Sequence, residues 1–188
     1  RQIPFERVRN CYEVARMLGL KIVIMCAAAR SSRLRIGEVV RLLGDEKIRI
    51  VGGVTTPESP SALAVETGFI PAGRARGISA EEIIVGNKHL DGPCTAVLRD
   101  VTIDPTGRIL PCCSAAGAVD SAAIGNAKRG NLKTLIREAR ERPLFKVLRA
   151  QGPAGLSRLL SSEPSSDYVN RCHLCYEALT DHRLSLVL

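Results

Sequence analysis

Seven cysteines are the residues of this chain whose type and spacing are suited to chemistry, and five of them lie from residue 94 onward. Cys172 and Cys175 form a CxxC pair, which lets two thiolates reach one metal from a single tight turn. The region around Cys112 supplies further cysteines from a distant part of the chain. Four thiolates in a reducing compartment are the ligands of a tetrahedral zinc ion or an iron–sulfur cluster. The sequence therefore predicts a metal centre.

The remaining cysteines and the histidines have simpler interpretations. An odd number of cysteines fits poorly with full disulfide pairing, and no secretion leader opens the sequence, so we expect reduced thiols in the cytoplasm. Cys11, on the apolar face of an expected helix, and Cys26, in an apolar strand, are interpreted as small buried hydrophobic residues. His173 is interpreted as a partly exposed spacer within the CxxC pair, and His89 and His182 as surface residues.

Composition restricts the classes of partner. The 188 residues are 45% hydrophobic and 24% charged, as in a soluble protein of one medium or two small domains. The longest apolar run, 22–29, is far shorter than the roughly 20 residues of a membrane helix. A net charge of +8 is compatible with nucleic acid, but the charges are interleaved along helices. Three Phe, three Tyr and no Trp leave little to stack on bases, which disfavours nucleic-acid binding.

The first half of the chain has an α/β pattern. We expect a helix over 4–19, a strand over 21–29 buried on both faces of a parallel sheet, a helix over 35–43 and a strand over 48–51. Two strands cannot form an independent parallel sheet, so further strands must come from upstream sequence or another chain. Residues 54–93, rich in Pro, Gly, Ser and Ala, are expected to be a connector with short helical pieces.

The second half predicts a small α+β domain that begins near residue 90. A hairpin of 97–103 and 108–113 is expected around a turn at 104–107, followed by helices over 131–142, 144–150 and 154–161. In this hairpin Ile103 would face Arg108 and Cys112 would face Arg99. A straight strand would then leave Cys94 roughly 16 Å away, so the chain must curl back before residue 99.

These patterns resemble a known family. Cys94, twelve residues, Gly107, four residues and Cys112, followed by a distant CxxC, resemble the auxiliary-cluster motif of radical SAM enzymes with a SPASM or, better, a twitch domain. DPTGRILPCC (104–113), IGN (124–126) and IPAGRA (70–75) resemble further segments of that family. The resemblance implies the last βα units of a partial (β/α)6 barrel with its connector over 1–90, and a twitch/SPASM-like domain over 91–188.

The resemblance also implies a function and its site. Cys94, Cys112, Cys172 and Cys175 would ligate one auxiliary [4Fe–4S] cluster, with Cys113 as a spare. Gly52 and Gly53 would lie near S-adenosylmethionine. The cluster would support radical chemistry on a peptide or small-molecule substrate.

This sequence lacks the family's CxxxCxxC motif, so the chain alone is expected to be inactive. S-adenosylmethionine and a second [4Fe–4S] cluster would belong to a full-length enzyme, whose missing barrel half lies in the same or another chain. The sequence identifies no catalytic residue.

An alternative remains open from the residues themselves. Four cysteines also suffice for a non-catalytic four-cysteine zinc module that binds nucleic acid or protein partners. The separation between Cys112 and Cys172 is long for a zinc ribbon, which lowers this hypothesis. In either case Cys113 is expected to point away from Cys112, since neighbours on an extended strand face opposite sides.

Overall fold

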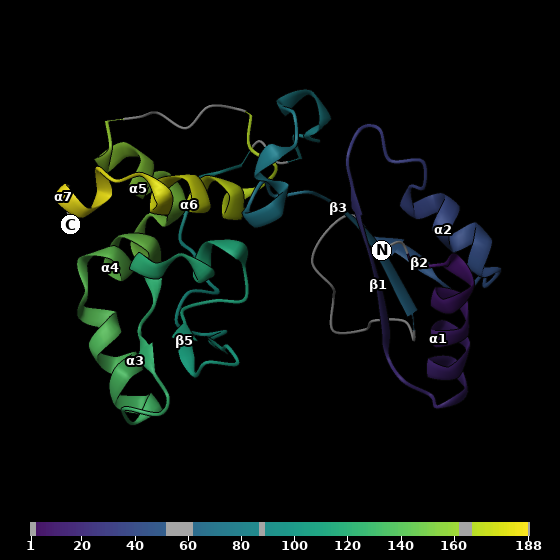
Figure 1. Cartoon of the computed structure of the whole chain (residues 1–188), viewed down its shortest axis with the longest axis horizontal. Coiled ribbons are helices and arrows are strands. Elements are labelled where there is room, and N and C mark those ends of the chain that lie inside the picture. The colour runs from purple at the N-terminus through teal and green to yellow at the C-terminus, as the bar shows by residue number, and fades with distance from the viewer. Residues whose placement is uncertain (1–2, 52–61, 87–88, 162–166, 188) are drawn as a thin grey trace. The chain divides into compact units, whose positions relative to one another are not determined.

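A computed structural model describes residues 3–51, 62–86, 89–161 and 167–187. The chain divides into two compact units. Unit 1 comprises Arg1–Phe69 and Ser79–Ile84, and unit 2 comprises Ile70–Ile78 and Val85–Leu188 (Figure 1). The expected domain boundary near residue 90 stays a prediction. No helix in the described ranges is long and apolar enough to cross a membrane.

Unit 1 is built on a parallel sheet of three strands, β1 (Ile22–Ala28), β2 (Arg49–Val51) and β3 (Ala62–Gly68), in the order β1-β3-β2. The strands β1 and β2 lie where the sequence predicts them. The central strand β3 corrects the expectation that 54–93 is only a connector with short helical pieces. Its sequence, ALAVETG, has few β-branched residues, and pairing with apolar strands on both sides overrides that weak local preference.

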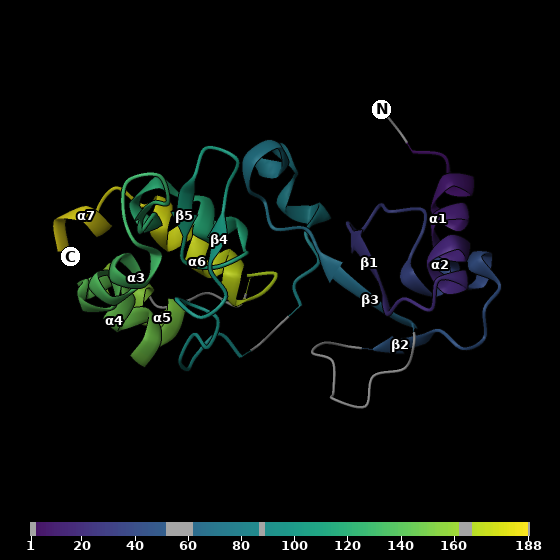
Figure 2. The same ribbon diagram turned by 90° about the horizontal axis from the view of Figure 1, so that it is seen from below.

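Two helices cover one face of this sheet (Figures 1 and 2). They are α1 (Phe5–Met17) and α2 (Ile36–Leu43), close to the predicted ranges. Gly44, in the left-handed region at φ 70°, ends α2 as a glycine C-cap should. The short helix η2 (Ala80–Glu82) also belongs to unit 1. The buried side chains between helices and sheet are those of Tyr12, Ile36, Ile48, Ala62 and Ala64.

The opposite face of the sheet exposes apolar side chains. Burial alternates along β1, and Val23 and Met25 are 56% and 70% exposed. Ile50 on β2 is 50% exposed. The prediction that 21–29 is buried on both faces is therefore wrong for this chain, because the helices of unit 1 pack on one side only.

The strand order also differs from the expected barrel fragment. In a (β/α) barrel each strand neighbours the next one along the chain. In unit 1, β3 instead lies between β1 and β2. The α/β character of unit 1 matches the prediction, whereas its strand order lends no support to a barrel.

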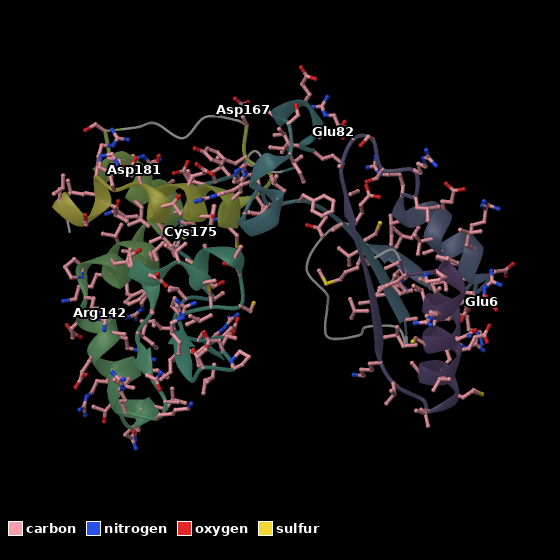
Figure 3. The ribbon with its side chains drawn as sticks, in the orientation of Figure 1. Glu6, Glu82, Arg142, Asp167, Cys175 and Asp181 are labelled. Atoms are coloured by element: carbon pink, nitrogen blue, oxygen red, sulfur yellow. The ribbon has the colours of Figure 1, made fainter. Side chains whose placement is uncertain are left out.

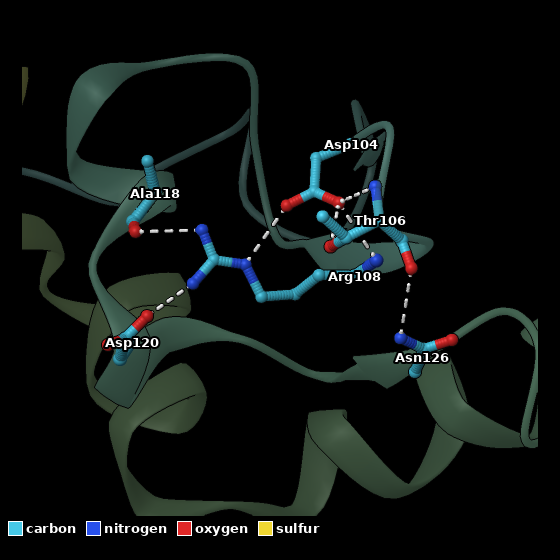
Figure 4. A network of polar contacts seen from close by, with 6 residues as sticks. All are labelled: Asp104, Thr106, Arg108, Ala118, Asp120 and Asn126. Carbon is cyan, nitrogen blue, oxygen red and sulfur yellow. Dashed lines mark hydrogen bonds and ion pairs between the residues drawn. The ribbon is translucent and has the colours of Figure 1, made fainter.

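Unit 2 contains a small antiparallel sheet of β4 (Thr102–Ile103), β5 (Arg108–Leu110) and β6 (Gly125–Asn126). The turn predicted at 104–107 is confirmed, with the Gly107 amide donating to the Asp104 carbonyl at 2.9 Å. Figure 4 shows the Asp104 carboxylate accepting from the Thr106 amide and hydroxyl and from Arg108. This network fixes the hairpin. Short helices η1 (Gly73–Gly77), η3 (Ala115–Ala118) and η4 (Asp120–Ala122) lie outside the sheet.

The hairpin differs from prediction in length and register. Ile103 pairs with Ile109 and Thr102 with Leu110, one residue away from the expected pairing of Ile103 with Arg108. The strand expected over 97–103 shrinks to two residues. Its start is no strand because Val97 and Leu98 are both buried and Leu98 adopts φ 58°, whereas an extended strand alternates its faces.

Five helices complete unit 2. The first three match predicted helices, and the side chain of Asn131 caps α3 by accepting from the Lys133 and Thr134 amides. Phe145, Ile109, Ile124 and Leu156 are fully buried where these helices meet the small sheet. The last two helices were not predicted. The five are α3 (Leu132–Glu141), α4 (Pro143–Ala150), α5 (Gly152–Leu159), α6 (Arg171–Thr180) and α7 (Leu184–Val187).

Candidate metal centre

The segment that carries Cys94 is anchored to three helices of unit 2. The Cys94 amide donates to the Leu148 carbonyl on α4 at 2.9 Å. The Arg171 guanidinium at the start of α6 donates to the carbonyls of Gly92 and Pro93. On α5, Gly152 lies so close that an added Cβ would collide with the Gly92 carbonyl oxygen. These contacts hold Cys94 beside α6.

Cys112 is brought next to this segment by a turn. The amides of Arg99 and Asp100 both donate to the Ala96 carbonyl, and the Leu98 amide donates to the Pro111 carbonyl at 2.9 Å. The expected curl before residue 99 is therefore confirmed, although the hairpin register predicted beside it is wrong. The turn places the chain around Cys94 alongside the chain around Cys112.

The surroundings of Cys112 are tightly packed. Its Sγ lies 3.3 Å from the Ser114 hydroxyl oxygen. A Cβ added to Gly117 would lie 2.7 Å from the Cys112 carbonyl oxygen and 2.9 Å from its Sγ. Real Cβ atoms essentially never lie this close to another heavy atom, so only glycine lets the short helix η3 approach Cys112 without a shift.

The CxxC pair lies on a helix rather than in the tight turn that the sequence suggested. Asn170 caps α6, its side chain accepting from the His173 amide at 3.0 Å. Residues three apart on a helix share one face, so the Cys172 and Cys175 side chains project to the same side. Cys175 is buried and belongs to the core of unit 2 (Figure 3).

The predicted ligands Cys94 and Cys112 act electrostatically on Cys172 and Cys175. Burial raises the pKa of the Cys172 thiol, and negative charge on Cys112 and Cys94 raises it further, against a hydrogen bond from Ser114 that lowers it. Burial likewise raises the pKa of Cys175, followed by the influence of Cys112, Cys172 and Cys94. Four thiols from three separate segments therefore lie within reach of one another's charge.

The arrangement stops short of a ligating geometry. In the described part of the chain, no group of three or more His, Cys, Asp or Glu side chains is placed so that it could hold a metal ion. All seven cysteines are free thiols. The donor chemistry fits a thiolate-bound metal, because a bound cation would stabilise the thiolate forms of Cys172 and Cys175, which burial and the neighbouring thiols disfavour. The metal centre itself stays a prediction.

Cys113 is exposed and does not lie on a strand, since β5 ends at Leu110. The expectation that an extended strand turns it away from Cys112 therefore rests on a wrong premise. Its charge still acts on Cys172, more weakly than that of Cys112 or Cys94. Cys113 thus lies at the edge of the cysteine group, by which we mean Cys94, Cys112, Cys172 and Cys175.

Of the predictions for the three histidines, the one for His173 is wrong. His173 is only 5% exposed, so its interpretation as a partly exposed spacer is wrong. Its Nδ1 accepts the Val169 amide at 3.2 Å, and its ring lies edge-on to Tyr168 with centroids 5.1 Å apart. Burial lowers its pKa. These contacts assign His173 to the packing of α6. His89 and His182 are exposed, as predicted.

The other predicted positions belong to unit 1. Cys11 is exposed, which contradicts the prediction of burial, because α1 turns Tyr12 toward the sheet instead. Cys26 is half-buried, and its Sγ lies 3.8 Å from the Leu34 carbonyl oxygen. Gly52 and Gly53, predicted near S-adenosylmethionine, lie outside the described residues.

Sequence reasoning missed the residues that support the cysteines. Arg171 precedes the CxxC pair and Ser114 follows the Cys112-Cys113 pair, but neither belongs to a metal-ligand pattern. It also missed a small cavity beside Cys94 that is lined by Arg99, Arg140 and other residues. Only the Asn170 cap, an asparagine just before an apolar segment, was a usable local signal, and it points to α6.

The sequence matches no protein-family model, and no curated protein matches it. The contacts within unit 2 are therefore what indicates a function for this chain. Those contacts concern the four converging thiols, the residues that anchor them and the cavity beside them.

Proposed function

We propose that unit 2 binds one [4Fe–4S] cluster through Cys94, Cys112, Cys172 and Cys175. One observation carries the proposal: hydrogen bonds tie the Cys94 segment both to the start of the helix that carries Cys172 and Cys175 and to the chain just before Cys112. Four cysteine thiolates are the usual ligand set of such a cluster. The resemblance of the motif to radical SAM enzymes favours iron–sulfur over zinc and gives the cluster an auxiliary role.

When bound, such a cluster supplies an electron acceptor or donor, or a point of attachment for a substrate. The chain's own residues would do the positioning. Arg171 ties the Cys94 segment to the helix that carries Cys172 and Cys175. Gly117 permits the close approach of η3 to Cys112. The burial of Cys175 keeps water from its sulfur.

The wider proposal is that this chain is the C-terminal part of a radical SAM enzyme acting on a peptide or small molecule. Cleavage of S-adenosylmethionine would need a CxxxCxxC segment and its own [4Fe–4S] cluster, from the same or another chain. The strand order of unit 1 lends no support to a barrel, so the proposal depends on unit 2. A reducing compartment such as the cytoplasm suits four free thiols.

Metal analysis after anaerobic reconstitution with iron and sulfide tests the cluster. We expect about four irons and four sulfides per chain, with a visible absorption band, because four thiolates hold one such cluster. Stoichiometric zinc without iron uptake would instead establish the alternative, a zinc module with four cysteine ligands. Neither metal at stoichiometric level would contradict both hypotheses.

Serine variants test the ligand set. Cys112→Ser is expected to remove most of the cluster absorbance, because a neutral hydroxyl is a poor replacement for a thiolate. Cys11→Ser, at an exposed cysteine of unit 1, is the matched control and should retain full iron content. We expect Cys113→Ser to retain it as well. Circular dichroism of each variant separates lost ligation from lost folding, and a loss confined to Cys113→Ser would shift the assignment by one residue.

The radical SAM assignment predicts that the chain alone does not cleave S-adenosylmethionine. Reconstituted protein with dithionite should yield no 5′-deoxyadenosine above a control without protein, since CxxxCxxC is absent. Mass spectrometry of the products is the measurement. Clear production would mean that the motif has been misassigned.

A further inference from the structure

A cavity of about 350 Å³ lies directly beside Cys94. Its wall comes from three parts of unit 2: the loop 93–99, Arg140 on α3 and Arg149 on α4. The loop contributes the thiol of Cys94, Thr95 and Arg99, and no lining residue is acidic. The volume is at the small end of the range for ligand sites. A cavity with three arginines and no carboxylate is suited to an anion.

The charges of the three arginines are not equally available. Arg99 is held by Asp100, with Nε–Oδ1 and Nη2–Oδ2 distances of 2.9 and 2.8 Å. Within the described ranges, the Arg140 guanidinium makes no hydrogen bond or ion pair.

Arg149 acts only weakly on Glu141, whose carboxylate is paired with Lys146 at 2.9 Å. Arg140 and Arg149 therefore leave about two positive charges uncompensated at the cavity.

This surplus favours one class of anion. Guanidinium groups donate paired hydrogen bonds to phosphate and carboxylate oxygens alike. A phosphate monoester carries about −1.5 to −2 charges at pH 7, whereas a single carboxylate carries only one. The phosphate group thus matches the charge of Arg140 and Arg149, and Thr95 adds a hydroxyl at the same wall.

We propose that this cavity binds the phosphate group of a small phosphorylated molecule through Arg140 and Arg149. The ligand would lie against Cys94, at the edge of the cysteine group. The proposal does not require the metal, since the lining arginines are placed by α3 and α4. A phosphodiester backbone could use the same arginines together with Lys133 and Arg137, which line a second cavity along α3. The scarcity of aromatic residues argues against that ligand.

Isothermal titration calorimetry of the full chain with inorganic phosphate and glycerol 3-phosphate tests the proposal. We expect one saturable site for both probes, and acetate about tenfold weaker or worse. Arg140→Gln and Arg149→Gln should each weaken phosphate binding about tenfold or more, since each removes a charge-assisted hydrogen bond. Arg129→Gln, which removes an exposed charge away from the cavity, should stay within about twofold.

Several results would overturn the proposal. These are the absence of saturable phosphate binding, acetate binding as tight as phosphate binding, or equal weakening by Arg129→Gln. Binding of a single-stranded oligonucleotide that phosphate does not displace would establish a nucleic-acid surface instead. Iron content of the Arg140→Gln variant, expected to be unchanged, keeps this test separate from the cluster: phosphate binding and iron uptake can each fail while the other holds.

Discussion

The two units of this chain differ in how completely they bury their apolar side chains. Unit 2 surrounds Phe145, Ile109 and Leu156 with helices and a small sheet, and all three are fully buried. Unit 1 covers one face of its sheet and leaves Val23 and Met25 more than half exposed on the other. Burial from several sides is what allows unit 2 to bring distant segments together.

The cysteines follow the same difference. In unit 2 they come from three segments that are tied to one another by hydrogen bonds and close packing. In unit 1, Cys11 is exposed and Cys26 is half-buried, and they lie on separate elements. What distinguishes the cysteines of unit 2 is therefore the contacts between their segments rather than their own exposure, since Cys94, Cys112 and Cys172 are half-buried like Cys26.

The largest expected effect comes from adding a methyl group at Gly152, in the closely packed unit 2. Gly152→Ala should lower the free energy of unfolding by about 3 kcal/mol or more, because the new methyl collides with the Gly92 carbonyl and residue 152 has φ 72°. Gly37→Ala is the matched control. Gly37 lies inside α2 of unit 1 with open space around it, so alanine there should raise the free energy of unfolding by up to about 1 kcal/mol.

Urea unfolding followed by circular dichroism measures both changes, and hydrogen exchange of peptides assigns them to a unit. Equal, small effects of Gly152→Ala and Gly37→Ala would show that the contact between α5 and the Cys94 segment is looser than described. The difference between the two units would then disappear.

A pair of tyrosines gives the next largest effect. The Tyr12 hydroxyl donates to the Asp45 carboxylate at 2.5 Å, so Tyr12→Phe should lower the free energy of unfolding by about 1 kcal/mol. Tyr176→Phe should cost less than about 0.5 kcal/mol, because its hydroxyl has no hydrogen-bond partner within the described ranges. Thermal unfolding measures both. A larger loss at Tyr176 would reverse the expected ranking.

Tyr12 also predicts a dependence on alkaline pH. Burial, followed by the bond to Asp45, raises its pKa from 10.0 to about 12. The stability contributed by its protonated form is complete below about pH 10 and is lost as pH rises toward 12. Hydrogen exchange of unit 1 should show this loss in the wild type and not in Tyr12→Phe. If Tyr12→Phe showed the same alkaline loss as the wild type, the loss could not be assigned to Tyr12.

An acid effect is expected in unit 2. Hydrogen bonding by the Thr106 hydroxyl, with the Arg108 and Thr106 amides, holds the pKa of Asp104 at about 2. Its stabilising charge is therefore present above the unfolded value near 4 and is lost as pH falls through 2. Asp104→Asn should flatten the fall of the melting temperature between pH 4 and 2. A parallel fall in both proteins would place the acid-sensitive group elsewhere.

The smallest effect is expected on the open face of unit 1. Met25→Gln should change the free energy of unfolding by less than about 0.5 kcal/mol, since its side chain is 70% exposed. Urea unfolding measures the change. A loss of more than about 1 kcal/mol would mean that this face is covered in solution.

Local signals in the sequence predicted much of the fold. Asn131 caps α3, Gly44 ends α2, and the turn at 104–107 forms where Asp, Pro and Gly prefer it. Each of these depends on a few neighbouring residues. The errors arise where distant residues decide: β3 is a strand because two others flank it, and the hairpin shifts because Val97 and Leu98 are both drawn into the core.

The candidate site was predictable in its residues but not in its geometry. The CxxC pair and the Cys112-Cys113 pair are visible in the sequence, and the choice of four ligands came from a family resemblance. Their convergence depends on Arg171 reaching Gly92 and on Gly117 approaching Cys112, contacts between segments far apart in the chain. The arginines of the cavity resemble an ordinary solvated helix face until α3 and α4 place them beside Cys94.

Leu98 has a consequence for which sequences this turn can accept. A non-glycine residue at φ 58° carries a backbone penalty of about 1–2 kcal/mol, while burial of its side chain contributes a comparable 1.5–3 kcal/mol. Glycine would relieve the backbone but leave a hole, and valine would fit neither the backbone nor the space. Most single substitutions at position 98 should therefore lower the free energy of unfolding. A change of residue at this turn would be tolerated only together with a compensating change in the core around it.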